Sequence, residues 1–287
     1  MRTESLREIA AKDFDLAPTL DSGQVFHWEK CGDGYAGTIG SLGVYVEQRR
    51  EWLRFSGVTA EAITNYFALD HPLAEICRSF PDDPAMSAAR DFCQGLRIIR
   101  QPRWECLATF ITSSMKQVAH IRQICRALRT RYGKRQRVMD CEVHSFPAAS
   151  RIAKLTEPDL QACALGYRAK NLLATARLVA TGGADLERWR ELSDDALRAR
   201  LCELPGVGAK VANCVMLFAY ERLRAFPIDV WIERVLKQKY FPRKRSVNAT
   251  QLRTFCETYF GEHGGYAQQY LFHHARKSGS APRGAAK

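Results

Sequence analysis

Residues 204–210 read Leu-Pro-Gly-Val-Gly-Ala-Lys, and residues 226–229, after an apolar stretch, read Phe-Pro-Ile-Asp. The first segment is too rich in glycine and proline to be helical, yet helical patterns lie on both sides, over 191–201 and 207–220. A tight turn between two helices leaves backbone N–H groups unpaired at the start of the second helix, where anions bind. The stretch therefore predicts two helices joined by a hairpin that holds an anion.

Lys210 and Asp229 are the candidate catalytic residues of this stretch. Lys210 falls on the first turn of the second helix, where the helix dipole opposes a positive charge and favours the free, nucleophilic amine. Asp229 follows Pro227 at the start of the next helical run, where its carboxylate can cap that helix or face the lysine. A helix joint without a ligand, and a plain cap at Asp229, are the alternatives to a catalytic site.

The composition favours a polyanionic partner. The 287 residues include 43 lysines and arginines against 31 acids, a formal charge of +12, and 46% are hydrophobic. This is the composition of a globular protein with room for two domains or one large one. Because no segment approaches 18 consecutive apolar residues, nucleic acid is a better partner than a membrane. A basic protein without such a partner is the alternative.

The cysteines and the two ends of the chain bear on its location. The ten cysteines are scattered without a Cys-x-x-Cys pair, so we expect no zinc site and mostly small buried thiols in a reducing cytosol. Residues 1–15 are charged and resemble no signal peptide, so we expect a cytoplasmic or nucleoid location in a bacterium, or a nuclear one in a eukaryote.

Residues 278–287 are small, polar and basic, and are predicted to form a disordered tail.

Periodicity predicts a small β domain followed by a large helical one. Residues 14–57 contain short apolar runs at 25–28, 35–39, 44–46 and 52–55, separated by glycine-rich turns that indicate an antiparallel meander. We place the β domain, with short helices, at 1–82 and the helical core at 83–277, and we expect them to pack as one body because no Gly/Ser-rich joint separates them. The predicted helices cover 59–67, 71–80, 86–93, 105–113, 118–132, 146–153, 157–165, 169–180, 191–201, 207–220, 229–239, 249–260 and 265–277.

From residue 17 to residue 272 the chain resembles the 8-oxoguanine DNA glycosylases of the helix-hairpin-helix Gly/Pro-Asp superfamily. Besides the hairpin, the resemblance is carried by Leu-Asp-Ser-Gly-Gln-Val-Phe-His-Trp at 20–28, by the segment 96–107, by Gly-Tyr-Arg-Ala-Lys at 166–170 and by Tyr-Ala-Gln-Gln-Tyr-Leu-Phe at 266–272. It implies an α+β fold, with an N-terminal antiparallel β-sheet domain and an all-α helix-hairpin-helix core. It also implies a monomer that excises 8-oxoguanine from damaged double-stranded DNA without a cofactor or metal.

The resemblance assigns the chemistry to the same two residues. In the family, the lysine at the position of Lys210 attacks the sugar C1′ and forms a Schiff base, and the aspartate at the position of Asp229 assists. β-Elimination then nicks the DNA, which makes the enzyme both a glycosylase and an apurinic-site lyase. Gly206, Gly208 and Val211, at the hairpin, would hold a phosphate.

The resemblance also implies a pocket for the damaged base. The carbonyl of Gly23 would accept from the N7–H of 8-oxoguanine, Gln268 would bind the Watson–Crick edge, and Phe272 and Cys214 would cover the two faces. This carbonyl would distinguish 8-oxoguanine from guanine, because N7 is a hydrogen-bond donor in 8-oxoguanine and an acceptor in guanine. A mispaired buried polar group costs roughly 1–3 kcal/mol. The alternatives are that Gly23 is an ordinary turn glycine, that Phe272 is a core residue and that Gln268 is solvated.

Two residues of the resembling loop would probe the duplex, and three positions depart from the family pattern. Tyr167 would wedge into the base stack, and Arg168 would contact the estranged cytosine. A run of three asparagines in the family is here Met115-Lys116-Gln117, an arginine is His120, and a histidine two residues after the aspartate is Trp231. With Met115 and His120, fewer polar side chains can hydrogen-bond the base opposite the lesion. The sequence therefore predicts a weaker preference for cytosine at that position, unless Lys116 or Gln117 restores the contacts.

Three other classes of protein share part of this pattern. Alkylated-base glycosylases share this architecture but have no lysine at the position of Lys210. The iron–sulfur members of the superfamily need four closely spaced cysteines near the C-terminus, where Cys256 stands alone. A non-catalytic DNA-binding module that uses the hairpin for phosphate contact has no need for Lys210 and Asp229 together.

Overall fold

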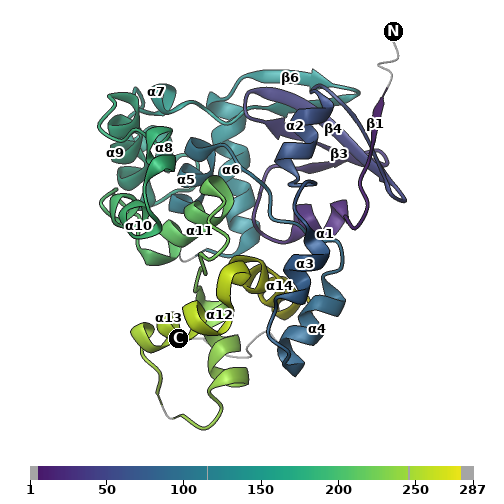
Figure 1. Cartoon of the computed structure of the whole chain (residues 1–287). Helices are drawn as coiled ribbons and strands as arrows, with labels where there is room; N and C mark the ends of the chain where they lie inside the picture. The colour runs from purple at the N-terminus through teal and green to yellow at the C-terminus, as the bar shows by residue number, and fades with distance from the viewer. Residues whose placement is uncertain (1–5, 115, 245, 279–287) are drawn as a thin grey trace.

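The structure is a computed structural model that describes residues 6–114, 116–244 and 246–278. An N-terminal antiparallel sheet precedes a helical core, as the sequence predicted (Figure 1). The sheet has the strand order β1-β5-β4-β3-β2. Its strands are β1 (Arg7–Ala10), β2 (Glu29–Cys31), β3 (Gly34–Ile39), β4 (Leu42–Arg49) and β5 (Trp52–Ser56), and a separate hairpin is formed by β6 (Arg135–Val138) and β7 (Cys141–His144).

Helix α1 was not predicted, because its segment was assigned to the antiparallel meander; the other helices follow the predicted order, with boundaries shifted by a few residues. Thr59, Thr156 and Ser193 each cap a helix by accepting a hydrogen bond from its first turn. The α-helices are α1 (Leu16–Asp21), α2 (Ala60–Tyr66), α3 (Leu73–Arg78), α4 (Pro84–Phe92), α5 (Arg103–Thr112), α6 (Val118–Tyr132), α7 (Ala149–Ile152), α8 (Glu157–Gln161), α9 (Arg168–Ala180), α10 (Asp194–Cys202), α11 (Ala209–Tyr220), α12 (Val230–Val235), α13 (Ala249–Tyr259) and α14 (Gly264–Lys277). Two 3₁₀ turns, η1 (Arg188–Glu191) and η3 (Gly261–His263), and a π-helix, η2 (Leu236–Tyr240), complete the helical elements.

Two of the strand predictions were wrong. Residues 25–28 form no strand. Val25 packs in the core under the sheet, whereas Phe26 packs in the helical core, so this segment connects the β domain to the helical core instead of pairing with a strand. The strand at Arg7–Ala10 was not predicted, because its sequence Arg-Glu-Ile-Ala lacks a clear apolar alternation. It pairs along β5, with Arg7 opposite Phe55, and closes the far edge of the sheet.

The β6–β7 hairpin corrects the expectation of an all-helical core after residue 84. It folds back onto the N-terminal sheet, where the Gln136 side chain accepts from the Gly43 N–H (3.0 Å) and donates to the Ser41 carbonyl (2.9 Å). Val138 and Val143 add apolar contacts to the same small cluster. The two parts of the chain therefore share an interface, as the missing linker indicated.

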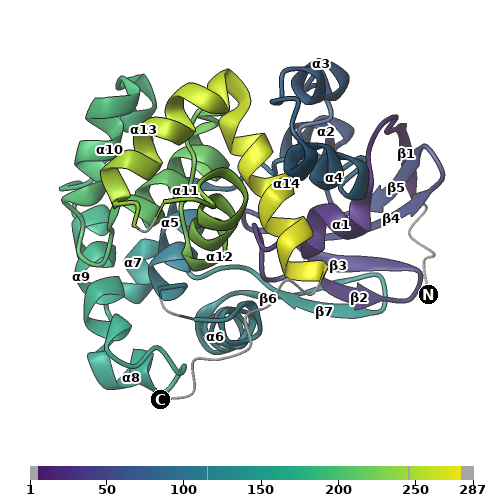
Figure 2. The same ribbon diagram turned by 90° about the horizontal axis from the view of Figure 1, so that it is seen from below.

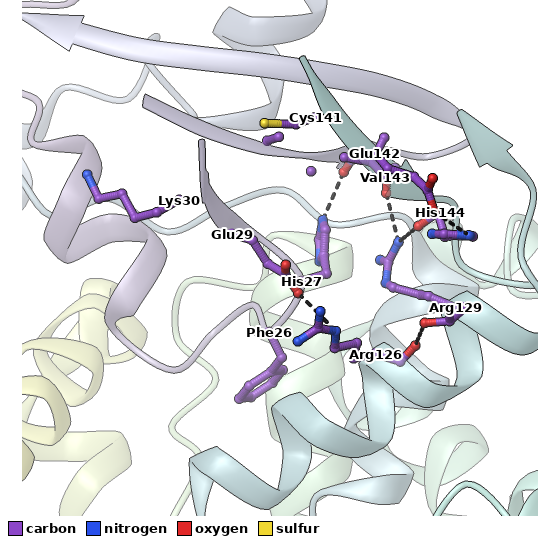
Figure 3. Close-up of a pocket in the computed structure, with 14 residues that line it drawn as sticks. Phe26, His27, Glu29, Lys30, Arg126, Arg129, Cys141, Glu142, Val143 and His144 are labelled. Atoms are coloured by element: carbon purple, nitrogen blue, oxygen red, sulfur yellow. Dashed lines mark hydrogen bonds and ion pairs between the residues drawn. The ribbon is translucent and has the colours of Figure 1, made fainter. Parts of the chain in front are cut away.

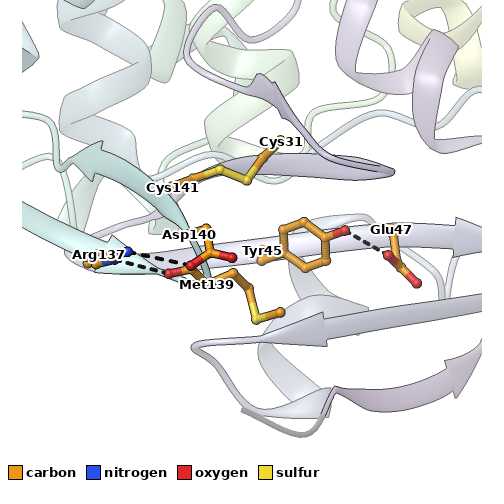
Figure 4. The surroundings of a disulfide bond; sticks show 7 residues. All are labelled: Cys31, Tyr45, Glu47, Arg137, Met139, Asp140 and Cys141. Carbon is orange, nitrogen blue, oxygen red and sulfur yellow. Dashed lines mark hydrogen bonds and ion pairs between the residues drawn. A yellow bond between two sulfur atoms is a disulfide. The ribbon is translucent and has the colours of Figure 1, made fainter. Parts of the chain in front are cut away.

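A disulfide between Cys31 and Cys141 ties β2 to this hairpin (Figure 4). It corrects the expectation that these cysteines are reduced: the ten thiols are far apart in sequence, and only folding brings this pair together. Of the other eight, six are buried, as predicted, whereas Cys77 is half-buried and Cys202 is exposed.

A buried ion pair fixes α6 against α5 and against the segment that follows α1. Arg129 donates to Glu105, to the Thr38 hydroxyl (2.8 Å) and to the His144 carbonyl (2.8 Å), while His27 lies 3.4 Å from the Glu105 carboxylate. Figure 3 shows His27 and Arg129 at the wall of a cavity of about 340 Å³ between the sheet, α6 and β7. This cavity contains none of the predicted site residues.

The helices that carry the predicted site meet in the helical core. Figure 2 shows α14 crossing the molecule between α1 and α11, with α12 in front of α11. The α5 helix lies beneath α11 and is buried over nearly its whole length. No helix in the described part of the chain is long and apolar enough to cross a membrane. The proposed boundary between residues 82 and 83 falls between α3 and α4.

Candidate active site

The hairpin between α10 and α11 has the predicted geometry of an anion site. Gly206 has a φ of +81°, and a Cβ there would lie 2.8 Å from the Cβ of Asn171, so only glycine fits the turn. Gly208 is the N-cap of α11 and has no side chain to pair with the first N–H groups of the helix. The Thr175 hydroxyl donates to the Pro205 carbonyl (3.0 Å) and fastens the hairpin to α9. Unpaired N–H groups at the start of α11 favour a bound phosphate.

Lys210 lies on the first turn of α11, and its amine rests on the end of α5. Its Nζ donates to the Ser113 hydroxyl oxygen at 3.0 Å and lies 5.3 Å above the centre of the Phe110 ring. The Ser113 hydroxyl itself donates to the Phe110 carbonyl (2.7 Å), so its oxygen is left to accept from the lysine. Sequence reasoning missed both α5 residues. Their apolar and serine pattern resembles any buried helix end, so no sequence signal singled them out.

Asp229 is the N-cap of α12, as the sequence predicted, and its carboxylate lies at the same cavity as Lys210. Its Oδ1 accepts from the Ile232 N–H at 2.8 Å. Burial raises the pKa of the Asp229 carboxyl above its usual range, while the Ile232 N–H and the positive charge of Lys210 oppose that rise. None of the ion pairs among the described residues joins Asp229 to Lys210, because the Lys210 amine donates to Ser113 and the Asp229 carboxylate accepts from the Ile232 N–H.

One small cavity brings together the two candidate catalytic residues and the four predicted base-recognition residues. Its volume is about 40 Å³, and its wall is formed by α5, α11 and α14, by the turn after α1 and by the N-cap of α12. The lining includes residues that the sequence did not single out, namely the apolar Phe110, Phe218 and Pro227 and the polar Gln269. The lining residues are Gly23, Phe110, Lys210, Cys214, Phe218, Pro227, Asp229, Gln268, Gln269 and Phe272.

Gly23 sits in a turn held by side-chain hydrogen bonds. Its φ is +85°, and a Cβ would lie 3.0 Å from the Phe272 ring, so a larger residue would strain the turn and crowd the cavity. Gln24 donates to the Thr19 carbonyl (3.1 Å), and Gln269 donates to the Ser22 carbonyl (2.9 Å). No hydrogen bond among the described residues uses the Gly23 carbonyl. A rigid, unpaired carbonyl at the cavity is the acceptor that recognition of an N7–H requires.

Cys214, Gln268 and Phe272 line the cavity from α11 and α14. Burial raises the pKa of the Cys214 thiol to about 11, so it stays a neutral packing group. Gln268 is only 4% exposed, and its side-chain oxygen has no hydrogen-bond partner among the described residues. A buried amide oxygen without a partner is costly, and it gives a ligand in the cavity a group to pair with. Phe272 is partly buried, with its ring against Gly23.

The two predicted probes of the duplex differ in exposure. Tyr167, at the start of α9, is 63% exposed, which suits a side chain that inserts between bases. Arg168 is 4% exposed, and its guanidinium donates to the Ser114 carbonyl (2.7 Å from Nε) and to the Leu165 carbonyl (3.3 Å). Its contact with an opposite base therefore requires the guanidinium to leave Ser114.

The remaining predicted DNA contacts lie around the same face. His120 is exposed on the first turn of α6, and Trp231 is partly buried on the first turn of α12. The Val211 side chain is buried, so only its backbone N–H is available to a phosphate. Met115 lies outside the described residues.

Comparison with known families agrees with this geometry. Residues 8–107 match the model of the 8-oxoguanine DNA glycosylase N-terminal domain, and residues 108–258 match that of the HhH-GPD superfamily of base excision DNA repair proteins. The chain belongs to the 8-oxoguanine DNA glycosylase branch of that superfamily. This glycosylase is 28% identical to a probable N-glycosylase/DNA lyase of Methanothermobacter thermautotrophicus, over 96% of its own length and 97% of the relative's. It is 30% identical to the N-glycosylase/DNA lyase of Saccharomyces cerevisiae, over 83% and 72% of the two chains.

Solved structures support the same assignment. MBOgg1, in complex with a low-affinity DNA ligand, is 29% identical, with a TM-score of 0.91 over 97% of this chain and 98% of that one. The Clostridium acetobutylicum 8-oxoguanine glycosylase/lyase, bound to duplex DNA with cytosine opposite 8-oxoguanine, is also 29% identical, with a TM-score of 0.88 over 97% and 99%. A 3-methyladenine DNA glycosylase of Archaeoglobus fulgidus shares the fold at 18% identity and a TM-score of 0.79.

Proposed function

We propose that this glycosylase removes 8-oxoguanine from duplex DNA and then cleaves the strand at the resulting abasic site. The observation that carries the proposal is the convergence of Lys210 and Asp229 on one cavity that Gly23 and Phe272 also line. A nucleophile beside a base-recognition pocket is what a lyase needs and what a non-catalytic DNA-binding module lacks.

The reaction starts with the free amine of Lys210. Its lone pair forms a bond to C1′ of the flipped nucleotide while the bond from C1′ to the base breaks, and the base leaves with that electron pair and takes up a proton. Asp229, a carboxylate at the same cavity, stabilises the positive charge that develops on the sugar. The sugar ring then opens to a Schiff base on Lys210, and loss of a proton from C2′ expels the 3′ phosphate by β-elimination.

The cavity must widen before a base can enter it. A volume of about 40 Å³ admits a few water molecules, whereas 8-oxoguanine is a two-ring base. The ring of Phe272 lies directly against Gly23, where an added Cβ would come within 3.0 Å of it, and both residues line the cavity. The Phe272 ring therefore moves aside and stacks on the base as the base enters.

Borohydride trapping tests the function directly. The wild-type chain is incubated with duplexes that hold 8-oxoguanine, unmodified guanine or an abasic site, and borohydride reduces any Schiff base to a stable crosslink. We expect crosslinks with 8-oxoguanine and with the abasic site, and none with guanine. Base release without any crosslink would show that water, and not a lysine, is the nucleophile, and that the protein is a glycosylase without lyase activity. If 8-oxoguanine is not released at all, the proposal is overturned.

Ser113→Ala is expected to slow base excision about tenfold, which corresponds to roughly 1.4 kcal/mol. The Ser113 oxygen fixes one N–H of Lys210 and so sets the direction of the lone pair; without it the amine samples several rotamers. Single-turnover rates at saturating enzyme measure the effect, with the Kd for DNA unchanged. Ser113→Thr keeps the hydroxyl and should restore the rate, and Ser114→Ala is the matched control because Ser114 acts through its carbonyl. A wild-type rate in Ser113→Ala would contradict this role.

Phe272→Ala is expected to reduce excision of 8-oxoguanine by five- to a hundredfold, since stacking of one base on an aromatic ring contributes roughly 1–3 kcal/mol. The measurement is the single-turnover rate on an 8-oxoguanine duplex. The control is Phe92→Ala, which removes a half-exposed ring that packs against His273 and His274 of α14 but does not line the cavity. If the two variants excise equally well, Phe272 is a core residue and the base binds elsewhere.

The opposite base is expected to matter little. Reading cytosine requires donors for O2 and N3 and an acceptor for N4–H, whereas Met115 can supply neither and His120 is shorter than an arginine. Arg168 is the one strong reader left among the residues assigned to this role. We expect single-turnover rates with cytosine, thymine, guanine or adenine opposite 8-oxoguanine to agree within about tenfold, or 1.4 kcal/mol. A cytosine preference of a hundredfold would mean that other residues read the opposite base.

A further inference from the structure

A group of basic side chains continues from the helix that Asp229 caps. The basic ridge, as we call it, consists of Arg234 on α12, Lys237 and Lys239 on the π-helix η2, and Arg243 and Lys244 in the loop that follows; all but the partly buried Arg234 are exposed. Within the ridge only Lys237 pairs with an acid, at 2.6 Å from Glu233. No other ridge residue takes part in an ion pair in the described part of the chain. The ridge therefore carries a net positive charge that nothing on the surface neutralises.

The ridge starts beside the reaction centre. Val230, next to Asp229, is 64% exposed, and Lys237 lies seven residues further, on the same face of the helix. With a rise of about 1.5 Å per residue, Lys237 lies roughly 12 Å along the helix from Asp229. Figure 1 shows this segment extending away from α11 and α14 towards the edge of the molecule.

Tertiary contacts hold the ridge in place. The Tyr240 hydroxyl at the end of η2 donates to the Asp83 carboxylate (3.1 Å), and the Tyr240 ring packs edge-on against Phe260. Phe241 packs against Phe255 of α13 with ring centres 4.8 Å apart. A preorganised set of cations loses little conformational entropy on binding. The π-helical turn itself is an uncommon conformation that is frequent at functional sites.

We propose that the basic ridge is a second DNA-binding surface, which holds backbone phosphates to one side of the damaged nucleotide. The occupant is the duplex that the active site engages, so this proposal rests on the proposed function. The ridge offers positively charged side chains that contact phosphates and no side chains that contact base edges, so its binding is independent of DNA sequence. It supplies affinity and register, and it leaves the chemistry at Lys210 unchanged.

The test compares two variants that remove the same charges. Lys239→Gln with Arg243→Gln removes one lysine and one arginine from the ridge. Lys12→Gln with Arg7→Gln removes the same pair from the edge of the N-terminal sheet, which Figures 1 and 2 both place at the opposite end of the molecule from α13. The Kd for an undamaged duplex is measured against potassium chloride concentration for both variants and for the wild type.

The ridge variant is expected to lower the slope of log K against log salt by about 1–2, since each phosphate contact contributes roughly 0.9. The sheet variant should keep the wild-type slope. A duplex cut to two base pairs on one side of the lesion should abolish the difference between ridge variant and wild type, and a cut on the other side should not. Equal slopes for the ridge variant and the wild type, or equal falls in both variants, would overturn the proposal.

Excision separates this proposal from the proposed function. At saturating enzyme and low salt, the ridge variant should release 8-oxoguanine and trap with borohydride at the wild-type rate. If the wild type itself fails to excise, the proposed function fails, while the salt slopes on undamaged DNA still decide the ridge. A ridge variant that binds like the wild type but excises tenfold more slowly would mean that the ridge acts on the chemistry, and would overturn its assignment as a phosphate-binding surface.

Discussion

Lys210→Gln is expected to abolish both base excision and borohydride trapping while DNA binding is kept. Glutamine is close to lysine in length but has no basic amine, so no bond to C1′ and no Schiff base can form. The amine lies at the base cavity in hydrogen-bond contact with Ser113, and no other lysine lines that cavity. Single-turnover release of 8-oxoguanine and trapping on an abasic duplex measure the loss, and a gel-shift or anisotropy titration measures binding.

The control for this loss is Lys170→Gln, which removes the same charge from the first turn of another helix, α9, where the side chain is exposed. That variant should excise and trap like the wild type. Full trapping by Lys210→Gln would assign the Schiff base to a different amine. Release of the base without trapping would show that Lys210 serves the lyase step alone.

Arg129→Leu is expected to lower the free energy of unfolding by about 3–5 kcal/mol. The side chains of Arg129 and Glu105 are 6% and 9% exposed, and Arg129 also donates to the Thr38 hydroxyl and the His144 carbonyl. Removing the arginine leaves a buried carboxylate and two further acceptors without their donor. Urea unfolding followed by circular dichroism measures the change through the denaturation midpoint.

The matched control lies three residues earlier on the same helix. Arg126 is exposed and pairs with Glu29 at 3.6 Å, and such surface pairs contribute about 0–1 kcal/mol. Arg126→Leu should therefore change stability by less than 1 kcal/mol. Adding Glu105→Gln to Arg129→Leu removes the unpaired charge and should recover part of the loss. Equal midpoints for the two single variants would show that the buried pair contributes no more than a surface pair.

The strongest sequence signals were those in which local chemistry permits few alternatives. Pro-Gly-Val-Gly between two apolar helices allows little except a hairpin, and the structure has glycine at φ +81° there. In the structure, helices begin at caps such as Thr156 and Ser193, because a side-chain acceptor satisfies N–H groups that no helix can satisfy itself. The wrong strand at 25–28 shows the limit of this reasoning, since a run of apolar residues does not reveal which body each side chain faces.

Several features depended on residues far apart in the chain. The Cys31–Cys141 disulfide joins cysteines separated by 110 residues, and no spacing rule singles out that pair among ten. The β6–β7 hairpin is stabilised by contacts with the N-terminal sheet, which its own sequence does not encode. Arg168 is buried against Ser114, although its pattern suggested an exposed reader of the opposite base.

The sequence by itself determined the order of the helices from α2 to α14, the hairpin, the two candidate catalytic residues and the family, because each depends on short-range geometry or on motifs that survive as strings of residues. The tertiary structure alone decided that Gly23, Lys210, Asp229 and Phe272 share one cavity, and that Ser113 is the partner of the Lys210 amine. The physical reason is that a cavity and a hydrogen-bond partner are properties of surfaces brought together by packing. Those surfaces come from α5, α11 and α14, from the turn after α1 and from the N-cap of α12, which only the folded core brings together.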